Sequence, residues 1–383
     1  MQGFLIVYLI FIFFFSFLTC IFLLPYVFRI GLQFNVIDKQ DERKLNFNNQ
    51  IRLGGLAIII PFYLSIFLSY LTNSFNYQLL NIDFGQFVPL IFVIIAGSLS
   101  FYTLGLSDDL FTLSPFLRLA IQIIIILILI SFGLIIDFNG FLEKINILQN
   151  SNIEYSLSVL LTVLFIAGVI NSFNWIDGLD GLASGVSGIV SLGYLTICLL
   201  ENNLIAAIFS ASIAGACFGF LKYNFYPSKI IMGDGGSYFI GFMNAIIGLI
   251  TICYNPDVVL NDLEFDKMYL NFSFDKLYLL FIFLFLPIFD MLMVIVRRLG
   301  RGKSPFYPDR THLHHLFCDK GLSQKRTVIF IYAITQWCVC LAINLNNISN
   351  NYNLILCSSL FLLIVVFLAF FKSKFVFFQR NKF

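Results

Sequence analysis

The segment FLIVYLIFIFFFSFLTCIFLL, residues 4–24, contains no charged side chain. A helix of about 20 apolar residues is long enough to cross the roughly 30 Å hydrocarbon core of a bilayer. The segment lacks the basic start and the small-residue cleavage site of a signal peptide, and it is too long for a signal-peptide core. We therefore expect it to be a first membrane span that the protein keeps.

The rest of the chain has the same character. Of 383 residues, 59% are apolar and 11% are charged, whereas about a quarter of the residues of a soluble domain are charged. Most of this chain therefore belongs in lipid, and we predict an all-α polytopic membrane protein that forms a single domain over residues 1–383. The predicted spans are 4–28, 55–72, 87–106, 117–137, 156–173, 182–200, 204–221, 236–253, 277–296, 327–345 and 353–371.

The basic residues indicate how these eleven spans are oriented. If the loops 29–54, 107–118, 174–181, 222–235 and 297–326 and the C-terminal tail lie inside, they hold 20 of the 23 Lys and Arg residues. Basic residues mark the cytoplasmic loops of membrane proteins. The pattern predicts an N-terminus outside and a C-terminus in the cytoplasm.

The first polar cluster follows the third span, where Asp108 and Asp109 are adjacent and Ser114-Pro115 and Arg118 come soon after. Two neighbouring carboxylates at a membrane boundary repel each other, which is unfavourable unless a cation or basic group lies nearby. The alternative is a solvated loop in which Ser114-Pro115 only starts the next helix.

The second cluster, NSFNWIDGLDGLASG at residues 171–185, has an amide or a carboxylate at every third position. Oxygen atoms of these groups are the ligands that Mg²⁺ prefers, and glycines let the backbone come close to a ligand. The alternative is a capped turn between two spans. The run also resembles part of the CDP-alcohol phosphotransferase signature, but the downstream Ala-Arg and spaced aspartates of that signature are missing.

The third cluster, IMGDGGS at residues 231–237, begins the eighth span and places an acid beside exposed backbone N–H groups. Such an arrangement can hold phosphate and a metal together, although glycine-rich helix starts are common.

The fourth cluster lies in the basic loop 297–326 and contains all three histidines, His312, His314 and His315. These could bind zinc, move a proton or donate to a diphosphate, and nearby Arg310 favours an anionic ligand. A zinc site would need a further ligand, for which Cys318 is the local candidate. We interpret Arg297 and Arg298 as ordinary cytoplasmic charges or lipid-headgroup contacts.

Together and in this order, the four clusters resemble the polyprenyl-phosphate N-acetylhexosamine-1-phosphate transferase family, glycosyltransferase family 4, over roughly residues 29–330. The form PDRTHLHH at residues 308–315 is similar to the branch that uses UDP-N-acetylglucosamine to begin O-antigen, enterobacterial common antigen or teichoic acid synthesis. The phospho-N-acetylmuramoyl-pentapeptide transferase branch has a Pro-[Ile/Val]-His-His-His form, which is absent here.

The resemblance implies an enzyme that moves N-acetylglucosamine 1-phosphate from UDP-N-acetylglucosamine to undecaprenyl phosphate and releases UMP. It implies Mg²⁺ as the cofactor, with Mn²⁺ as a substitute, and a cytoplasmic active site in a bacterial inner (plasma) membrane. The partners would be the two substrates and the lipid bilayer, with no nucleic acid. Another UDP-N-acetylhexosamine or a muramoyl-pentapeptide substrate stays open, as do the prenyl chain length and a homodimeric state.

The resemblance also implies roles for particular residues. Asp234 and Asn174 would hold the metal. Asp108 and Asp109 would be catalytic, either taking the last proton of the lipid phosphate or positioning it. The residues implied in substrate binding are Arg52, Asn171, Asp177, Asp180, Arg310, His312, His314 and His315.

Some residues differ from the family pattern, and one other class of protein stays open. Asn46 stands where histidine is usual, Asn49 and Ile51 where prolines are usual, and Ile231 where an aromatic residue is frequent. A transporter is the alternative from another class, but its acids would line a path between the two faces. Here the acids lie at one boundary.

Overall fold

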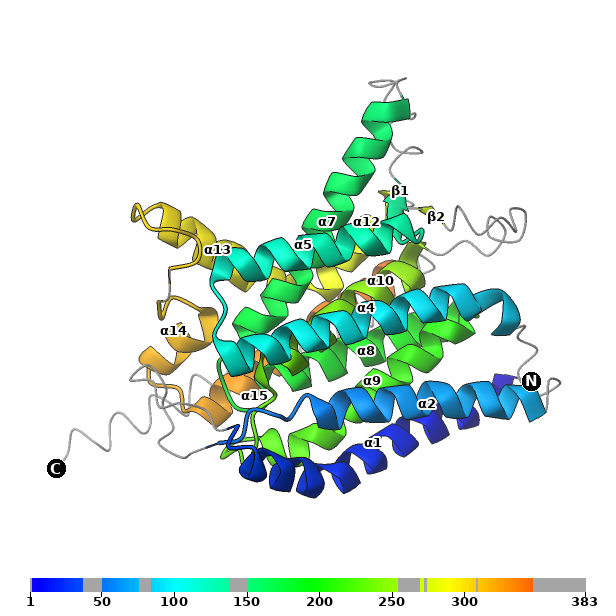
Figure 1. Ribbon diagram of the computed structural model, residues 1–383, viewed down its shortest axis with the longest axis horizontal. Coiled ribbons are helices and arrows are strands. Elements are labelled where there is room, and N and C mark those ends of the chain that lie inside the picture. The colour runs from blue at the N-terminus through cyan, green and yellow to red at the C-terminus, as the bar shows by residue number, and fades with distance from the viewer. Residues whose placement is uncertain are drawn as a thin grey trace.

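The computed structural model describes residues 2–36, 50–75, 84–137, 151–253, 269–271, 274–307 and 309–346. Helices dominate this part of the chain (Figure 1). They are α1 (Gln2–Gln33), α2 (Leu56–Phe75), α4 (Phe84–Phe111), α5 (Pro115–Ser131), α7 (Ser151–Ile176), α8 (Leu182–Leu200), α9 (Leu204–Asn224), α10 (Gly233–Cys253), α12 (Phe274–Phe283), α13 (Phe285–Leu299), α14 (Leu313–Asp319) and α15 (Gln324–Asn346).

The helices confirm an all-α membrane protein with several spans. Ten of the eleven predicted spans fall on them, and the eleventh, residues 353–371, lies outside the described residues. Within the described residues, seven helices are long and apolar enough to cross a membrane: α1, α4, α7, α8, α9, α10 and α15. Helices α2 and α5 contain shorter apolar stretches, Leu56–Thr72 and Pro115–Ser131. The total of eleven and the orientation stay predictions.

Several predicted spans end at other residues than the observed helices. The span predicted at 117–137 is helical only to Ser131, because Gly133 has a positive φ of 91° that a helix cannot continue, and residues 135–137 form a strand instead. The span predicted at 277–296 is divided at Leu284 into α12 and α13, because Pro287 cannot donate a backbone hydrogen bond to the preceding turn. Helix α4 continues to Phe111 and α7 to Ile176. Asp108, Asp109 and Asn174 therefore lie in last helical turns, although the sequence placed them in loops.

Two short strands were not predicted. Strand β1 (Ile135–Asp137) pairs in parallel with β2 (Tyr269–Asn271), with Ile135 opposite Tyr269. The pair closes the end of the bundle that is opposite the α4–α5 connection (Figure 1).

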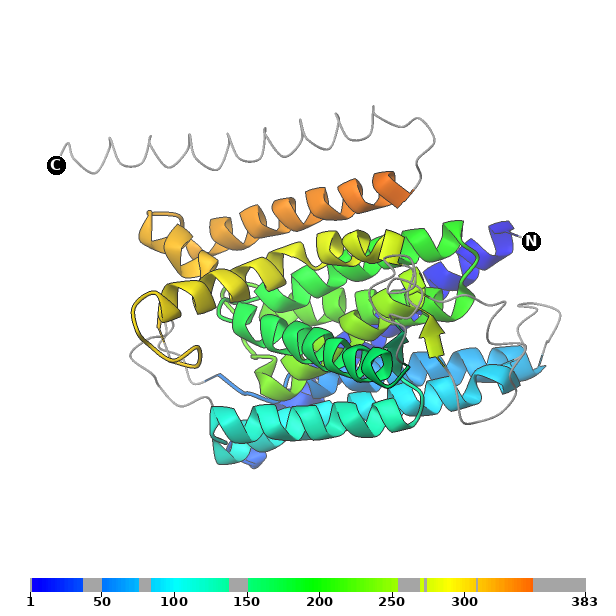
Figure 2. The same ribbon diagram turned by 90° about the horizontal axis from the view of Figure 1, so that it is seen from above.

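The helices run side by side, with α10 at the centre of the bundle (Figures 1 and 2). The whole apolar window of α10 is buried, against 22% of the window of α1, so α10 meets protein where α1 presents an apolar surface suited to lipid. The α4–α5 connection, the end of α13 and helix α14 lie at the same end of the bundle, at the left in both views. Side chains from distant parts of the sequence meet at this end.

Candidate functional site

Arg52 is placed by a short extended segment that runs beside residues 230–232. Ile231 N–H donates to the carbonyl oxygen of Ile51 at 2.9 Å, and Gly54 N–H donates to that of Ile231 at 3.0 Å. This backbone pairing brings residues 51–55 to the start of α10, whose first turn carries Asp234. A carboxylate is favoured there by the positive end of the helix dipole.

Helix α4 can approach the start of α10 closely because Gly105 has no side chain. A Cβ atom at Gly105 would overlap the backbone carbonyl of Asp234, so the last turns of α4 can lie directly on the first turn of α10. The contact lets Gly235 N–H donate to Asp109 Oδ2 at 3.2 Å. A small residue at this position is therefore a condition for assembling the site.

Three carboxylates surround one guanidinium in what we call the acidic cluster: Asp109, Asp177, Asp234 and Arg52. Arg52 Nη2 lies 3.0 Å from Asp109 Oδ1 and 3.5 Å from Asp234 Oδ1. Burial alone would lower the pKa of Arg52, but Asp234 and Asp109 outweigh it and raise that pKa, so Arg52 stays charged. The carboxylates outnumber the guanidinium, and the cluster therefore favours a further cation.

Asp177 lies between α7 and α8 and interacts electrostatically with the rest of the acidic cluster. Removal from water raises the pKa of Asp177 well above its usual value, and the negative charges of Asp234 and Asp109 act in the same direction against the opposing effect of Arg52. The crowding of like charges is thus a property of the whole cluster, and a bound cation would relieve it.

Asn174 joins the cluster from the last turn of α7. Its Nδ2 donates to Asp234 Oδ1 at 2.9 Å and to Ser237 Oγ at 3.0 Å. The two residues implied as metal ligands are therefore in contact. In the described residues, no group of three or more His, Cys, Asp or Glu side chains could hold a metal by itself. Mg²⁺ keeps several waters and needs few protein oxygens, so Asp234 and the amide oxygen of Asn174 fit it as donors.

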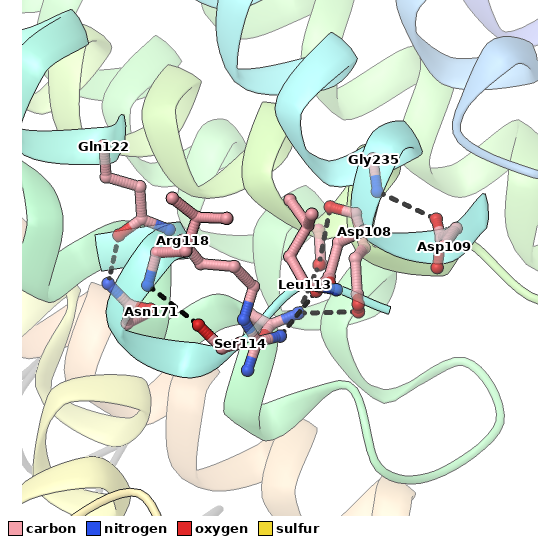
Figure 3. A network of polar contacts seen from close by, with 12 residues as sticks. Asp108, Asp109, Leu113, Ser114, Arg118, Gln122, Asn171 and Gly235 are labelled. Atoms are coloured by element: carbon pink, nitrogen blue, oxygen red, sulfur yellow. Dashed lines mark hydrogen bonds and ion pairs between the residues drawn. The ribbon is translucent and has the colours of Figure 1, made fainter. Parts of the chain in front are cut away.

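Asp108 pairs with a different basic residue from Asp109, although the two are adjacent (Figure 3), and its side chain also interacts with that of Asp234. Its Oδ2 accepts from Arg118 Nη1 at 2.5 Å, and its Oδ1 accepts from Leu113 N–H at 2.8 Å. Ser114 caps α5, which Pro115 begins. Ser114-Pro115 does start a helix, but the alternative of a merely solvated loop is wrong, because Asp108 lies in α4, is 5% exposed and binds a basic partner.

The three histidines lie together in what we call the histidine cluster: His312, His314 and His315. The rings of His314 and His315 have centroids 4.3 Å apart, and those of His312 and His314 are 5.4 Å apart. His312 Nδ1 lies 2.9 Å from Asp290 Oδ2. Burial lowers the pKa of His314 well below its usual value, and the neighbouring histidines add to this, so His314 is neutral at pH 7.

The histidine cluster contacts the loop of the second sequence cluster. A Cβ atom at Gly178 would overlap His314 Nε2, so the ring lies directly on the backbone between Asp177 and Asp180. Neither ring nitrogen of His314 has a hydrogen-bond partner among the described residues. A buried ring without partners is suited to a polar ligand that enters between the two loops.

A pocket of about 190 Å³ lies between the histidine cluster and the start of α5. Arg298 is 4% exposed, donates from Nη2 to Asp309 Oδ1 at 2.9 Å and has its guanidinium carbon 4.9 Å from the Trp175 ring centre. The interpretation of Arg298 as an ordinary loop charge was therefore wrong, because α13 continues to Leu299 and carries this side chain inward. The residues lining the pocket are Pro115, Arg118, Trp175, Arg298, Phe306, Asp309 and His312.

Three of the residues implied in substrate binding lie outside the acidic and histidine clusters. Two of them form hydrogen bonds with other parts of the protein, and the third is exposed. Asn171 Nδ2 donates to Gln122 Oε1 at 2.7 Å and joins α7 to α5 (Figure 3). Asp180 Oδ2 accepts from Ser228 N–H at 3.0 Å and anchors the connection between α9 and α10. Arg310 is exposed, although its charge is felt by His315.

Two residues of this region were missed in the sequence. Asp290 is 3% exposed and holds His312. It is the only charged residue in the predicted span 277–296, and an ionisable residue inside a span is a reason to expect function. Trp175 stands inside the second cluster but carries no polar pattern, so nothing in the sequence distinguished it from a core residue.

Comparison with known proteins identifies the family. Residues 91–252 match the sequence model of glycosyl transferase family 4. A Bacillus subtilis protein described as a probable undecaprenyl-phosphate N-acetylglucosaminyl 1-phosphate transferase is 30% identical over 83% of this chain and 80% of its own length. The decaprenyl-phosphate N-acetylglucosaminephosphotransferase of Mycobacterium tuberculosis H37Rv is 31% identical over 76% of this chain and 71% of its own.

A second group of relatives carries a different description. The phospho-N-acetylmuramoyl-pentapeptide-transferase of Prochlorococcus marinus MIT 9215 is 29% identical over 78% of this chain and 78% of its own length. All of these relatives are transferases that match most of the chain. The chain is therefore a membrane-embedded transferase and belongs to glycosyl transferase family 4, the polyprenyl-phosphate N-acetylhexosamine-1-phosphate transferases.

Proposed function

We propose that this protein transfers N-acetylglucosamine 1-phosphate from UDP-N-acetylglucosamine to undecaprenyl phosphate and releases UMP. The step would begin the synthesis of a cell-envelope polysaccharide at the cytoplasmic face of a bacterial inner membrane. The observation that carries the proposal is that Arg118, which lines the pocket together with Arg298 and His312, interacts electrostatically with Asp234 of the acidic cluster. The descriptions of the Bacillus and Mycobacterium relatives support the sugar and the lipid.

The chemistry requires two anionic phosphates to approach each other. An oxygen of the lipid phosphate attacks the phosphorus bonded to the sugar, and the bond from that phosphorus to the oxygen of UMP breaks. Neutralising and orienting the phosphate oxygens is therefore the main task of the site. Arg118 and Arg298 line the pocket with His312, and guanidinium groups match phosphate geometry well.

Asp234 and Asn174 would hold the divalent cation, with Asp109 and Asp177 adding negative charge around it. A cation bound there would supply charge neutralisation to the diphosphate and to the departing UMP. Arg52 holds Asp109 and Asp234 in place, at 3.0 and 3.5 Å. These two carboxylates are thereby pre-oriented before any ligand arrives.

A general base is not a strong requirement, because the second pKa of a phosphate monoester lies near 6 and the nucleophile is largely dianionic at neutral pH. Asp108 already accepts from Arg118 and Leu113 N–H, and Asp109 forms an ion pair with Arg52 and accepts from Gly235 N–H. Carboxylates with these partners are better suited to positioning than to proton removal, so positioning is the role we propose for both.

The proposal is tested by giving purified protein undecaprenyl phosphate with a panel of UDP-sugars that includes UDP-N-acetylglucosamine, UDP-N-acetylgalactosamine and UDP-N-acetylmuramoyl-pentapeptide. We expect UMP and a lipid-linked sugar diphosphate in equal amounts with UDP-N-acetylglucosamine. Formation of UDP would show glycosyl transfer, which contradicts the proposed reaction. Turnover with the muramoyl-pentapeptide alone would assign the chain to the other branch.

Removal of divalent cations is expected to abolish transfer reversibly. Thorough chelation with EDTA takes away the cation that the acidic cluster is proposed to bind, so lipid product should fall below detection and return when Mg²⁺ or Mn²⁺ is added in excess. Addition of Ca²⁺-loaded EDTA is the control for effects of the chelator itself. Activity that survives chelation would rule out the metal role of Asp234 and Asn174.

Substitution of Gly178 by alanine is expected to reduce transfer by about tenfold, because a misplacement of about 1 Å in a site can lower a rate by one to two orders of magnitude. The added Cβ atom would overlap His314 Nε2 and push the histidine cluster away from the loop. Gly168 of α7, where a Cβ would meet only the end of the Met291 side chain at 4.0 Å and φ is not positive, gives a matched Gly→Ala control. Equal activity of both variants would contradict the close packing of His314 on Gly178.

A further inference from the structure

Asp290 is a buried carboxylate with both of its oxygen atoms in use. Its Oδ2 lies 2.9 Å from His312 Nδ1, and its Oδ1 accepts from Leu313 N–H at 2.6 Å. It therefore holds both the ring of His312 and the start of α14 to the side of α13. Asp290 takes no part in the reaction proposed for this site.

The contact with Asp290 determines which nitrogen of His312 is available to a ligand. An ionised carboxylate can only accept hydrogen bonds, so the proton between the two groups belongs to Nδ1. The ring nitrogen that remains is Nε2, and His312 lines the pocket. The ring is also confined between Trp175, which meets it edge-on at 5.9 Å, and His314, which stacks at 5.4 Å.

The same arrangement is repeated for the other two basic side chains of the pocket. Arg118 is bound to Asp108 at 2.5 Å, and Arg298 is bound to Asp309 at 2.9 Å. Each of the three nitrogen-bearing groups is thus held by its own carboxylate, and of these carboxylates Asp309 also lines the pocket. Partners of this kind fix the orientation of binding groups and thereby strengthen the binding of a ligand.

We propose that Asp290 is a positioning residue that fixes the ring and the proton of His312, so that Nε2 meets a substrate phosphate held between Arg118 and Arg298. Because the proton of the ring lies on Nδ1, Nε2 accepts a second proton, which a phosphate monoanion or water supplies, and holds it towards the phosphate oxygen. No bond to phosphorus is made or broken by the histidine. The phosphate is either that of the lipid or the diphosphate of the nucleotide sugar. The inference rests on the proposed function, whose reaction supplies both phosphates.

The variant Asp290→Asn separates the effect on His312 from support of the fold. The side-chain oxygen of asparagine can still accept from Leu313 N–H, but its NH₂ group would donate to His312 Nδ1 and move the ring proton to Nε2. We expect kcat/KM to fall by about 10- to 100-fold, the usual range for residues that orient a ligand-binding side chain. Asp290→Ala should lose at least as much activity.

A double-mutant cycle with His312→Gln shows whether Asp290 acts through the histidine. Glutamine has no ring proton to place, so adding Asp290→Asn to His312→Gln should change kcat/KM by less than about twofold, as expected for residues that act as one unit. Asp319→Asn is the matched control. It removes an exposed carboxylate from α14, the helix that begins after His312, and its kcat/KM should equal that of the wild type.

The KM values distinguish the two phosphates. A rise confined to undecaprenyl phosphate would place the lipid phosphate in the pocket, and a rise confined to UDP-N-acetylglucosamine would place the diphosphate there. The inference is overturned if Asp290→Asn retains wild-type kcat/KM while only Asp290→Ala is impaired. It is also overturned if Asp290→Asn lowers kcat/KM by the same factor in the His312→Gln background as in the wild type. Wild-type protein that fails to form lipid product in the same assay would instead overturn the proposed function.

Discussion

Replacing Asp234 by asparagine is expected to lower the rate of transfer by about 10³-fold and to leave the protein folded. The side-chain oxygen of asparagine can still accept from Asn174 Nδ2, as Asp234 Oδ1 does at 2.9 Å. The variant loses a negative charge where a cation and two phosphates are proposed to meet, and electrostatic groups of this kind contribute factors of about 10² to 10³ or more. The measurement is kcat/KM at saturating Mg²⁺.

The control for this variant is Glu201→Gln, which removes a carboxylate at the C-terminal end of α8, far from the acidic cluster. It should transfer at the wild-type rate. Comparable melting temperatures in detergent would show that both variants are folded. Near-normal turnover of Asp234→Asn would remove Asp234 from the site and with it the proposed metal position.

Replacing Asp108 by asparagine is expected to lower transfer by about 10²-fold for a different reason. The amide oxygen can still accept from Leu113 N–H, which Asp108 Oδ1 does at 2.8 Å, so the turn before α5 should be kept. The ion pair with Arg118 at 2.5 Å is lost, and the guanidinium is free to leave the pocket. Loss of preorganised charge near a reacting phosphate costs rate more than stability.

Neutralising both members of the ion pair tests this explanation. Asp108→Asn and Arg118→Gln should each be impaired, and the double variant should be little worse than the more impaired of the two, because the residues act together. Losses that multiply would show that Asp108 has a task independent of Arg118, such as taking the proton of the lipid phosphate.

The meeting of the four polar clusters could be predicted from the sequence because topology limits where they lie. The basic residues assign every cluster to loops on one face, and ends of neighbouring spans on one face are near each other. The structure confirms the contact for Arg52, Asp109 and Asp234, which are far apart in the chain. The face itself, cytoplasmic by the distribution of charge, stays a prediction.

The different partners of Asp108 and Asp109 could not be predicted. The sequence placed them in a loop, where neighbouring side chains can share a ligand. In the structure they lie in the last turn of α4, and successive residues of a helix point about 100° apart. Asp108 therefore faces Arg118 on the following helix, whereas Asp109 faces Arg52 and Gly235.

Motif spacing predicted too much for Asn171 and too little for Asp290. Asn171 fits the three-residue pattern of the second cluster, but it lies about one helical turn before Asn174 and meets Gln122 of α5 instead of the acidic cluster. Asp290 fits no motif and was counted within an apolar span, yet it holds His312. Motif spacing shows which residue types follow one another along a helix. It does not show which residue of a neighbouring helix each one contacts, because that depends on how the helices pack.

If widely separated loops form one site on a single membrane face, cysteines placed in two of these loops should be labelled from the same side. Phe111→Cys and Lys320→Cys place exposed thiols after Asp109 and at the end of α14. A membrane-impermeant maleimide should label both in inside-out vesicles and neither in right-side-out vesicles, beyond the background of the unmodified protein. Labelling of the two positions from opposite sides of the membrane would show that the α4–α5 connection and α14 do not belong to one site.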